Sequence, residues 1–218
     1  MGIKDASYHL TLLAKDHDGY KNLIKLSSIA QLQGFYYKPR IDKEVLARHA
    51  KGLIGMSGCL KGEIANTVMN GDEKAALEAV EFYKCVFGKD NFFIEIHDHG
   101  IPEQKRVNPA LVSLSRRAGV GLVAANDCHY VNRKDAPAHD ALLCIQTGTT
   151  VAEEKRLKLY NDQFYFKSPQ EMAALFTEIP EALHNTIKVA SHCNLQLNFD
   201  KKYLPRFPLP EGVSARDY

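Results

Sequence analysis

The chain has 218 residues, of which 45% are hydrophobic, so it can bury a sizeable core as a soluble globular protein. Its 28 Lys and Arg residues against 26 Asp and Glu residues leave a formal charge of +2. This balance gives no global electrostatic reason for tight binding to nucleic acid or membranes, and any contact with a polyanion would have to be local.

Short apolar runs alternate with helical patterns through the first two thirds of the chain. We expect strands over residues 8–14, 53–56, 92–97 and 120–125. We expect helices over residues 18–33, 72–88, 102–118 and 136–145. Asp72 and Gly88 are typical first and last caps of the second helix, and Pro109 predicts a kink or break in the third. Four strand-helix units indicate a parallel α/β sheet with outer helices, either open and doubly wound or closed into a barrel.

The last third has a different pattern. Residues 148–166 have little periodicity, and Ser168 to Glu171 form a capping box that starts a short helix. A second helix is expected over residues 180–193, with Leu183, Ile187 and Ala190 as its apolar stripe. These two helices predict a helical hairpin packed on the sheet. We therefore divide the chain into a β/α portion (1–147), a loop and hairpin (148–202) and an extended linker (203–218).

A carboxylate and an imidazole follow the fourth expected strand. Side chains alternate between the two faces of an extended chain, so Asp127 and His129 point the same way and Cys128 points into the packing on the other side. In parallel α/β folds, functional residues gather where strands end. This spacing is typical of a pair of metal ligands.

Two more strand ends carry ligand-type side chains. Cys59 follows the second strand, and His97 and His99 follow the third. A thiolate, an imidazole and a carboxylate would suit zinc or a similar divalent ion, which lowers the pKa of bound water and binds a phosphate oxygen. His9 could add an imidazole, but it lies early in its strand. Either that strand begins upstream or His9 belongs to the core.

Other interpretations of these residues stay open. Asp127 could cap a turn, Cys59 could be a small buried hydrophobe, and His97 and His99 could only hydrogen-bond in their turn. A nucleophilic pair of Cys59 with His129 is conceivable, although nothing in the sequence supplies its oxyanion hole. Five further histidines have no partner that the sequence identifies, at positions 17, 49, 139, 184 and 192. Spacing alone indicates a metal-dependent hydrolase at most.

The spacing of the cysteines and the hydropathy of the sequence indicate the cellular compartment. The five cysteines are odd in number, widely spaced and without a Cys-x-x-Cys pair, which favours reduced thiols over a disulfide framework or a zinc ribbon. No apolar run approaches the ~20 residues needed to cross a bilayer, and the N-terminus lacks a signal-peptide layout. We expect a cytoplasmic protein without membrane contact.

Several long motifs, in order, resemble the PHP (polymerase and histidinol phosphatase) domain of bacterial DNA polymerase III alpha subunits. They are YHLTLLAK around His9, LIGMSGCLKGEI around Cys59, FFIEIHDHGIPEQ from Phe92, and VAANDCHYV around Asp127 and His129. Later stretches, YFKSPQEM from Tyr165 and YLPRFP from Tyr203, are similar to the passage from that domain toward the polymerase palm. The resemblance covers essentially the whole chain.

The resemblance implies a distorted β/α barrel with a cluster of divalent metals at the strand ends. By motif, His9, Cys59, Asp127 and His129 match ligand positions for zinc or manganese, whereas His97 and His99 match none and are weaker candidates. It also implies DNA replication by the intact polymerase, with DNA, a proofreading subunit and a sliding clamp as partners. In this superfamily the cluster hydrolyses phosphoesters, and in some polymerases it is associated with 3′-5′ exonuclease activity.

The chain departs from that family at its beginning. The family's opening ligand motifs have no counterpart, because the chain starts near the fourth strand of the barrel. We therefore expect a partial barrel with an incomplete cluster, weak metal binding, no polymerase palm and no activity of the fragment alone. No residue is assigned as catalytic. Two alternatives remain open: a stand-alone metal-dependent phosphoesterase, and a non-catalytic scaffold domain of the polymerase.

Overall fold

The structure, a computed structural model, describes residues 7–200, 202, 204, 208–214, 216 and 218. Its strands are β1 (Thr11–Ala14), β2 (Leu53–Met56), β3 (Phe92–His97) and β4 (Gly121–Ala125). Its helices are α1 (His17–Leu32), α2 (Lys43–Arg48), α3 (Glu63–Met69), α4 (Glu73–Phe87), α5 (Pro102–Ala118), the short 3-10 helix η1 (Arg133–Asp135), α6 (Ala136–Thr147), α7 (Pro169–Leu175) and α8 (Pro180–His192). The expected α/β class is confirmed. The expected linker over 203–218 lies partly outside the described residues.

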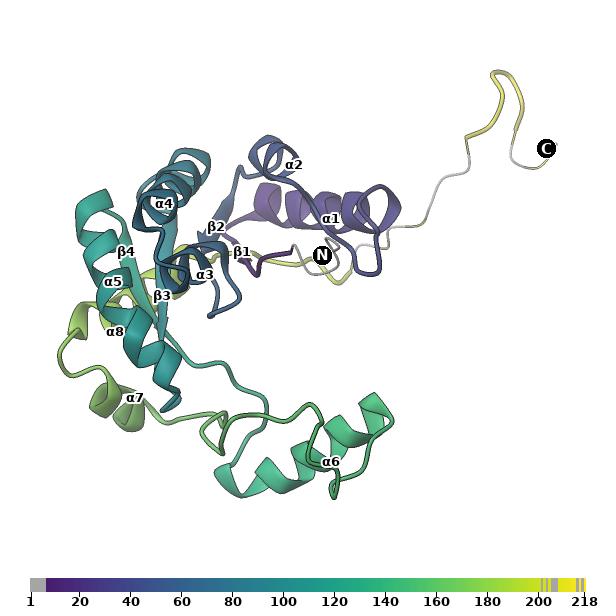
Figure 1. Cartoon of the computed structure of the whole chain (residues 1–218). Helices are drawn as coiled ribbons and strands as arrows, with labels where there is room; N and C mark the ends of the chain where they lie inside the picture. The colour runs from purple at the N-terminus through teal and green to yellow at the C-terminus, as the bar shows by residue number, and fades with distance from the viewer. Residues whose placement is uncertain (1–6, 201, 203, 205–207, 215, 217) are drawn as a thin grey trace.

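The four strands form one sheet in the order β1-β2-β3-β4 (Figure 1). The pairs β2–β3 and β3–β4 are parallel, as expected, but β1 is antiparallel to β2, with Thr11 opposite Met56 and Ala14 opposite Leu53. The all-parallel prediction is therefore wrong for the first strand. Its connection to β2 contains two helices, α1 and α2, which together return the chain to the edge where β1 ended.

The passage from β1 into α1 is closely packed against the entry to β2. Lys15 N donates to Gly52 O at 2.9 Å, and Asp16 caps α1 by accepting from Gly19 N at 2.9 Å. A Cβ added at Gly19 would lie 1.9 Å from Gly52 O, so only glycine permits this approach of the two backbones. The contact holds the end of β1 beside the start of β2.

Most helix limits follow the local signals in the sequence. Asp72 caps α4 by accepting from Ala75 N at 2.9 Å, and Gly88 ends that helix with φ +83°. The capping box between Ser168 and Glu171 is present at the start of α7. The break that Pro109 predicts is absent, because α5 continues through that residue.

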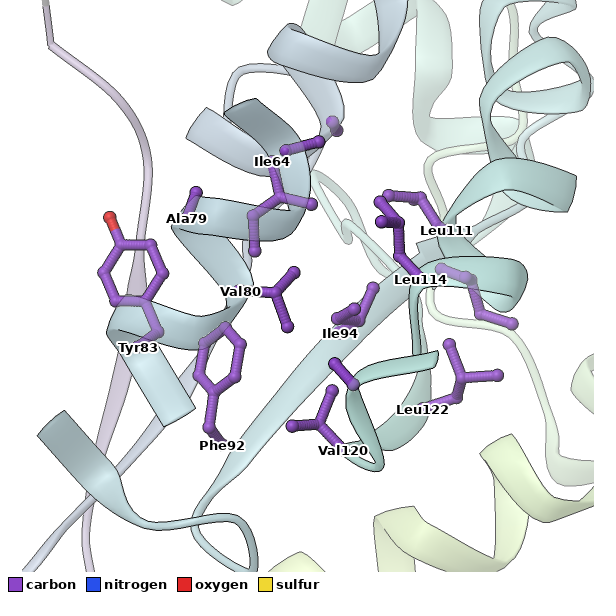
Figure 2. Close-up of a cluster of buried hydrophobic side chains, with 14 of the residues drawn as sticks. Ile64, Ala79, Val80, Tyr83, Phe92, Ile94, Leu111, Leu114, Val120 and Leu122 are labelled. Atoms are coloured by element: carbon purple, nitrogen blue, oxygen red, sulfur yellow. The ribbon is translucent and has the colours of Figure 1, made fainter. Parts of the chain in front are cut away.

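The main core lies between the sheet and helices α3, α4 and α5 (Figure 2). Phe92 and Ile94 of β3 point into it, and the rings of Tyr83 and Phe92 stack with their centroids 5.3 Å apart. Alternation along β3 turns Phe93 to the opposite face, where it packs with Val189 of α8. The helices therefore cover both faces of the sheet.

Helix α8 packs against β4, which agrees with a hairpin on the sheet, but through other residues than those predicted. Ala182 and Val189 are its buried apolar residues, and Asn185 donates to Leu122 O at 2.8 Å. Ile187 is 70% exposed and Ala190 is exposed as well, so the predicted stripe is wrong in these two positions. The face of α8 that meets the sheet therefore carries Asn185 together with Ala182 and Val189.

Helix α6 and the segment 148–166 stand apart from the sheet (Figure 1). Arg156 joins the two parts of this unit through a bidentate ion pair with Asp140, with N···O distances of 2.5 and 2.7 Å. As expected, 148–166 contains no helix or strand, and it contacts the chain after β4 through the bridge between Tyr130 and Tyr165. Among the helices in the described residues, none is long and apolar enough to cross a membrane.

Candidate metal centre

Because of its direction, β1 brings His9 to the end of the sheet where the other predicted ligands lie. Because β1 is antiparallel to β2, the start of β1 lies beside the end of β2, where Cys59 follows. His9 N donates to Lys61 O at 3.0 Å, and His9 Nδ1 lies 3.7 Å from Cys59 Sγ. The early position of His9 in its strand is therefore no obstacle, and the two predicted ligands form one pair.

Asp127 and His129 form a second pair after β4. His129 Nε2 lies 3.3 Å from Asp127 Oδ1, with these side chains 37% and 44% exposed. Cys128 does not point into the packing as expected: it is exposed, and its Sγ donates to Tyr165 O at 3.8 Å. The strand ends at Ala125, so strict alternation no longer applies to these residues.

The segment 161–167 holds the second pair in place through backbone contacts. Phe164 O accepts from His129 N at 2.8 Å, and Tyr165 O accepts from Asn126 Nδ2 at 2.9 Å. Lys167 Nζ donates to Asn126 Oδ1 at 3.4 Å, and burial lowers the pKa of this lysine. The orientation of Asp127 and His129 therefore depends on residues nearly forty positions later.

Between the two pairs, the end of β3 carries a buried acid and a buried imidazole. Glu95 and His97 are 5% and 7% exposed, and His97 Nε2 lies 3.1 Å from Glu95 Oε2. Gly58 N, next to Cys59, donates to Glu95 Oε1 at 3.2 Å. Burial raises the pKa of the Glu95 carboxyl, but His97 and the hydrogen bonds from Thr11 and Gly58 outweigh burial and hold the pKa below its usual range.

His99 lies in a different environment from His97. It is 1% exposed, and its ring stacks on Phe164 with centroids 4.5 Å apart. Burial, and then the charges of His97 and Lys167, lower the pKa of His99 to about 4. His97 lines the same cleft as the two ligand pairs, whereas His99 packs behind Phe164.

All four predicted ligands line one cleft of about 860 Å³, here called the strand-end cleft. It is also lined by Glu95, His97 and His139. Imidazole, thiolate and carboxylate are the donors that zinc takes, and the buried Nδ1 of His97 has no hydrogen-bond partner among the described residues, so the chemistry of the cleft fits a divalent ion. Within the described part of the chain, however, no three such side chains come close enough together to hold one. The cleft contains two ligand pairs, separated by the end of β3.

Two residues of the cleft were not predicted from the sequence. Glu95 could have been noticed in the sequence, because it is the one acid in the strand Phe92–His97 and apolar residues flank it on both sides. No feature of the sequence indicated His139. It lies on α6, and only the fold brings the centre of its ring to 5.5 Å from that of the His129 ring. The imidazole next to Cys59 is that of His9, which argues against a nucleophilic pair of Cys59 with His129.

A family model and several curated relatives resemble this chain. Residues 1–99 match the family model described as PHP domain. The match ends just after β3, and the boundary predicted at residue 147 stays a prediction.

Over nearly its whole length the chain is homologous to a segment of the DNA polymerase III alpha subunits. It is 44% identical to DNA polymerase III subunit alpha of Treponema pallidum (strain Nichols) over 211 residues, which are 97% of this chain. It is 46% identical to that of Thermus aquaticus over 223 residues (100% of this chain) and 47% identical to that of Deinococcus radiodurans over 216 residues (96%). The chain spans only 16% to 18% of the length of these relatives.

Proposed function

We propose that this chain is a segment of a replicative DNA polymerase alpha subunit and contributes the later part of a metal-binding PHP domain. The observation that supports the proposal best is that His9, Cys59, Asp127 and His129 all line the strand-end cleft, although they come from three separate parts of the chain. The relatives named DNA polymerase III subunit alpha support the wider assignment. The same proposal includes activity on DNA, partnership with a proofreading subunit and a sliding clamp, and a cytoplasmic location.

The two ligand pairs would hold zinc or manganese together with further ligands of the kind that the PHP resemblance implies. A bound divalent ion supplies Lewis-acid stabilisation of a phosphate oxygen and a lower pKa for water. His9 and Cys59 offer a nitrogen and a sulfur donor, and Asp127 and His129 offer an oxygen and a nitrogen donor. Each pair alone falls short of the three protein ligands of catalytic zinc sites.

The buried Glu95 orients the first ligand pair. Its carboxylate accepts from the backbone of Gly58, directly before Cys59, and so fixes the turn that carries the thiol. The same carboxylate holds His97 facing the cleft. These contacts act on the protein side of the site and do not depend on the identity of the ion.

The chain alone is therefore proposed to bind a divalent ion weakly and to hydrolyse phosphodiesters little or not at all. The intact polymerase would hold a fuller cluster, with phosphoesterase or 3′-5′ exonuclease chemistry. One observation favours the alternative of a non-catalytic scaffold: no three ligand side chains converge among the described residues. The stand-alone phosphoesterase alternative has less support, because the chain matches short segments of much longer proteins named DNA polymerase III subunit alpha.

Elemental analysis of the purified protein, followed by titration with zinc and manganese, tests the metal assignment. Asp127→Ala and His129→Ala should each weaken binding by tenfold or more, on the order seen when ligand contacts of a metal site are lost. His184→Ala, at an exposed position on α8, serves as the matched control. Metal content that neither Asp127→Ala nor His129→Ala changes would remove the site and leave the scaffold function.

A further inference from the structure

The loop between α1 and α2 exposes three consecutive aromatic side chains. Residues 33–41, here called the aromatic loop, read QGFYYKPRI. Phe35, Tyr36 and Tyr37 are 58%, 56% and 64% exposed. Large apolar side chains that gather on a surface mark interaction sites more often than isolated ones do. The position of the loop beside the start of β1 makes it a neighbour of the strand-end cleft.

The aromatic loop is a built structure with defined internal contacts. Arg40 N donates to Gly34 O at 3.2 Å and Tyr36 N donates to Lys38 O at 3.2 Å, so the loop closes on itself. The Arg40 guanidinium donates to Tyr36 O at 2.9 Å and lies 5.6 Å from the centre of the Tyr36 ring. Tyr37 has φ +60°, the one positive φ outside glycine in the described residues. Backbone strain of this kind clusters at functional sites of proteins.

Its chemistry combines flat rings with positive charge. The rings of Tyr36 and Tyr37 meet edge to face with centroids 4.6 Å apart, and the loop carries Lys38 and Arg40 but no acidic residue. The next acid along the chain, Asp42, is engaged as the cap of α2, where it accepts from Val45 N at 2.7 Å. Rings on which bases can stack, next to cations that contact a phosphate backbone, are the features of single-strand binding surfaces.

A hollow lies beside the end of the aromatic loop. It has a volume of about 380 Å³ and is lined by Pro39, Arg40 and Ile41 of the loop, by Tyr8 and Leu10, and by the acids Asp42 and Glu63. Tyr8 and Leu10 also line the strand-end cleft, so the two hollows meet along the chain that leads into β1. Tyr8 is itself 54% exposed and adds a fourth ring between the loop and His9. The cleft contributes a further cation, Lys61.

We propose that the aromatic loop binds single-stranded nucleic acid and leads it along Tyr8 toward the strand-end cleft. Bases stack on the rings of Phe35 and Tyr36, and Lys38 contacts the phosphate backbone. This inference extends the proposed function by naming the substrate form that reaches the cleft. Duplex DNA is excluded from this mode because its paired bases do not expose their faces to side chains.

Fluorescence anisotropy with a labelled 12-nucleotide single-stranded DNA tests the proposal on the full chain at low salt. Binding is measured in EDTA, so failure of metal-dependent hydrolysis leaves the result unaffected. Tyr36→Ala should raise Kd about tenfold, the typical effect of removing one base-stacking ring. Tyr36→Phe, which keeps the ring, should retain the affinity. Phe199→Ala, at a side chain that is 88% exposed elsewhere on the molecule, is the matched control and should leave Kd unchanged.

The salt dependence of binding gives an independent measurement. Lys38→Ala should reduce the slope of log Kd against log salt by about 0.7, the value for one lost phosphate contact on a single strand. Equal Kd values for Tyr36→Ala and Phe199→Ala, or equal affinity for a duplex of the same sequence, would overturn the proposal. A self-association seen by sedimentation and lost in Tyr36→Ala, without any DNA binding, would instead assign the loop to protein contacts.

Discussion

The Nδ1 atom of His9 lies 3.7 Å from the Sγ atom of Cys59, although fifty positions separate the two residues in the chain. The contact exists because β1 runs antiparallel to β2, so that the start of one strand meets the end of the other. An imidazole and a thiol are donors that soft metal ions take, and we propose that this pair forms one half of a metal site. The other half, Asp127 with His129, lies beyond the end of β3.

Cobalt titration of Cys59→Ser should report on the first pair directly. The unaltered protein should develop the near-ultraviolet charge-transfer absorption of a cobalt-thiolate bond, and the variant should lose it, because an alcohol is a much poorer ligand than a thiolate. We expect cobalt affinity to fall by about tenfold or more. The measurement is an absorption spectrum at increasing cobalt concentration.

Cys85→Ser provides the control, since Cys85 is an exposed thiol on α4 outside the cleft. It should keep both the absorption and the affinity. If the absorption survives in Cys59→Ser and disappears in Cys85→Ser, the thiol ligand has been assigned to the wrong residue.

Glu95→Ala should destabilise the protein strongly. The substitution leaves Gly58 N and His97 without their buried acceptor, and each buried polar group left unsatisfied costs about 1 to 3 kcal/mol. Glu95→Gln retains one oxygen acceptor and should cost less. The measurement is the free energy of unfolding from urea denaturation at pH 7.

Glu78→Ala is the matched surface substitution, because Glu78 is 67% exposed and pairs with Lys74 across one helical turn. Its effect should stay within about 0.5 kcal/mol. Similar losses in Glu95→Ala and Glu78→Ala would mean that the buried carboxylate is not a structural anchor of the cleft.

His99 should make stability depend on pH in the acid range. Its folded pKa is about 4, below the 6.5 of a free histidine, because burial disfavours the charged ring. Between pH 4 and pH 6.5, His99 is protonated in the unfolded chain and neutral in the folded chain. The contribution of His99 to stability is therefore complete above pH 6.5 and is lost as the pH falls through 4, by on the order of 3 kcal/mol.

Urea denaturation between pH 4 and pH 7 measures this loss. His99→Gln should show a shallower decline than the unaltered chain, whereas His184→Gln, at an exposed position, should follow the unaltered chain. Parallel pH curves for all three proteins would contradict the assignment to His99.

Phe164 should affect both stability and metal binding. Its ring is 6% exposed, stacks on His99 at 4.5 Å and meets the ring of His129 edge to face at 5.5 Å. Phe164→Ala should cost about 3 to 5 kcal/mol through the cavity that it creates. Phe164→Leu fills more of that space, so the protein should stay folded while cobalt affinity falls because His129 loses its aromatic support.

Phe166→Leu, two residues later at a side chain that is 72% exposed, is the control for both measurements. It should leave the free energy of unfolding and the cobalt affinity unchanged. Unaltered cobalt binding in Phe164→Leu would show that the backbone contact from Phe164 O is enough to hold His129.

Helices α4 and α7 could be predicted, although they differ in length, because their capping signals are local. Asp72 and Gly88 bound α4, and Ser168 starts α7, where caps and periodicity act within a few residues. The short helices α2 (Lys43–Arg48) and α3 (Glu63–Met69) were missed, since two turns carry too little periodicity to be recognised.

Sequence patterns therefore identified the strands, most helix ends and each ligand as a candidate. The pairing of Asp127 with His129 could be expected from their closeness in the sequence, although the strand ends at Ala125 and the contact with Phe164 O helps to position His129. The fold alone placed His9 beside Cys59 and brought His139 to His129, because strand direction and the position of α6 depend on contacts between distant segments. It also buried Glu95 between the pairs, an outcome that no local pattern encodes because burial depends on every element packed around β3.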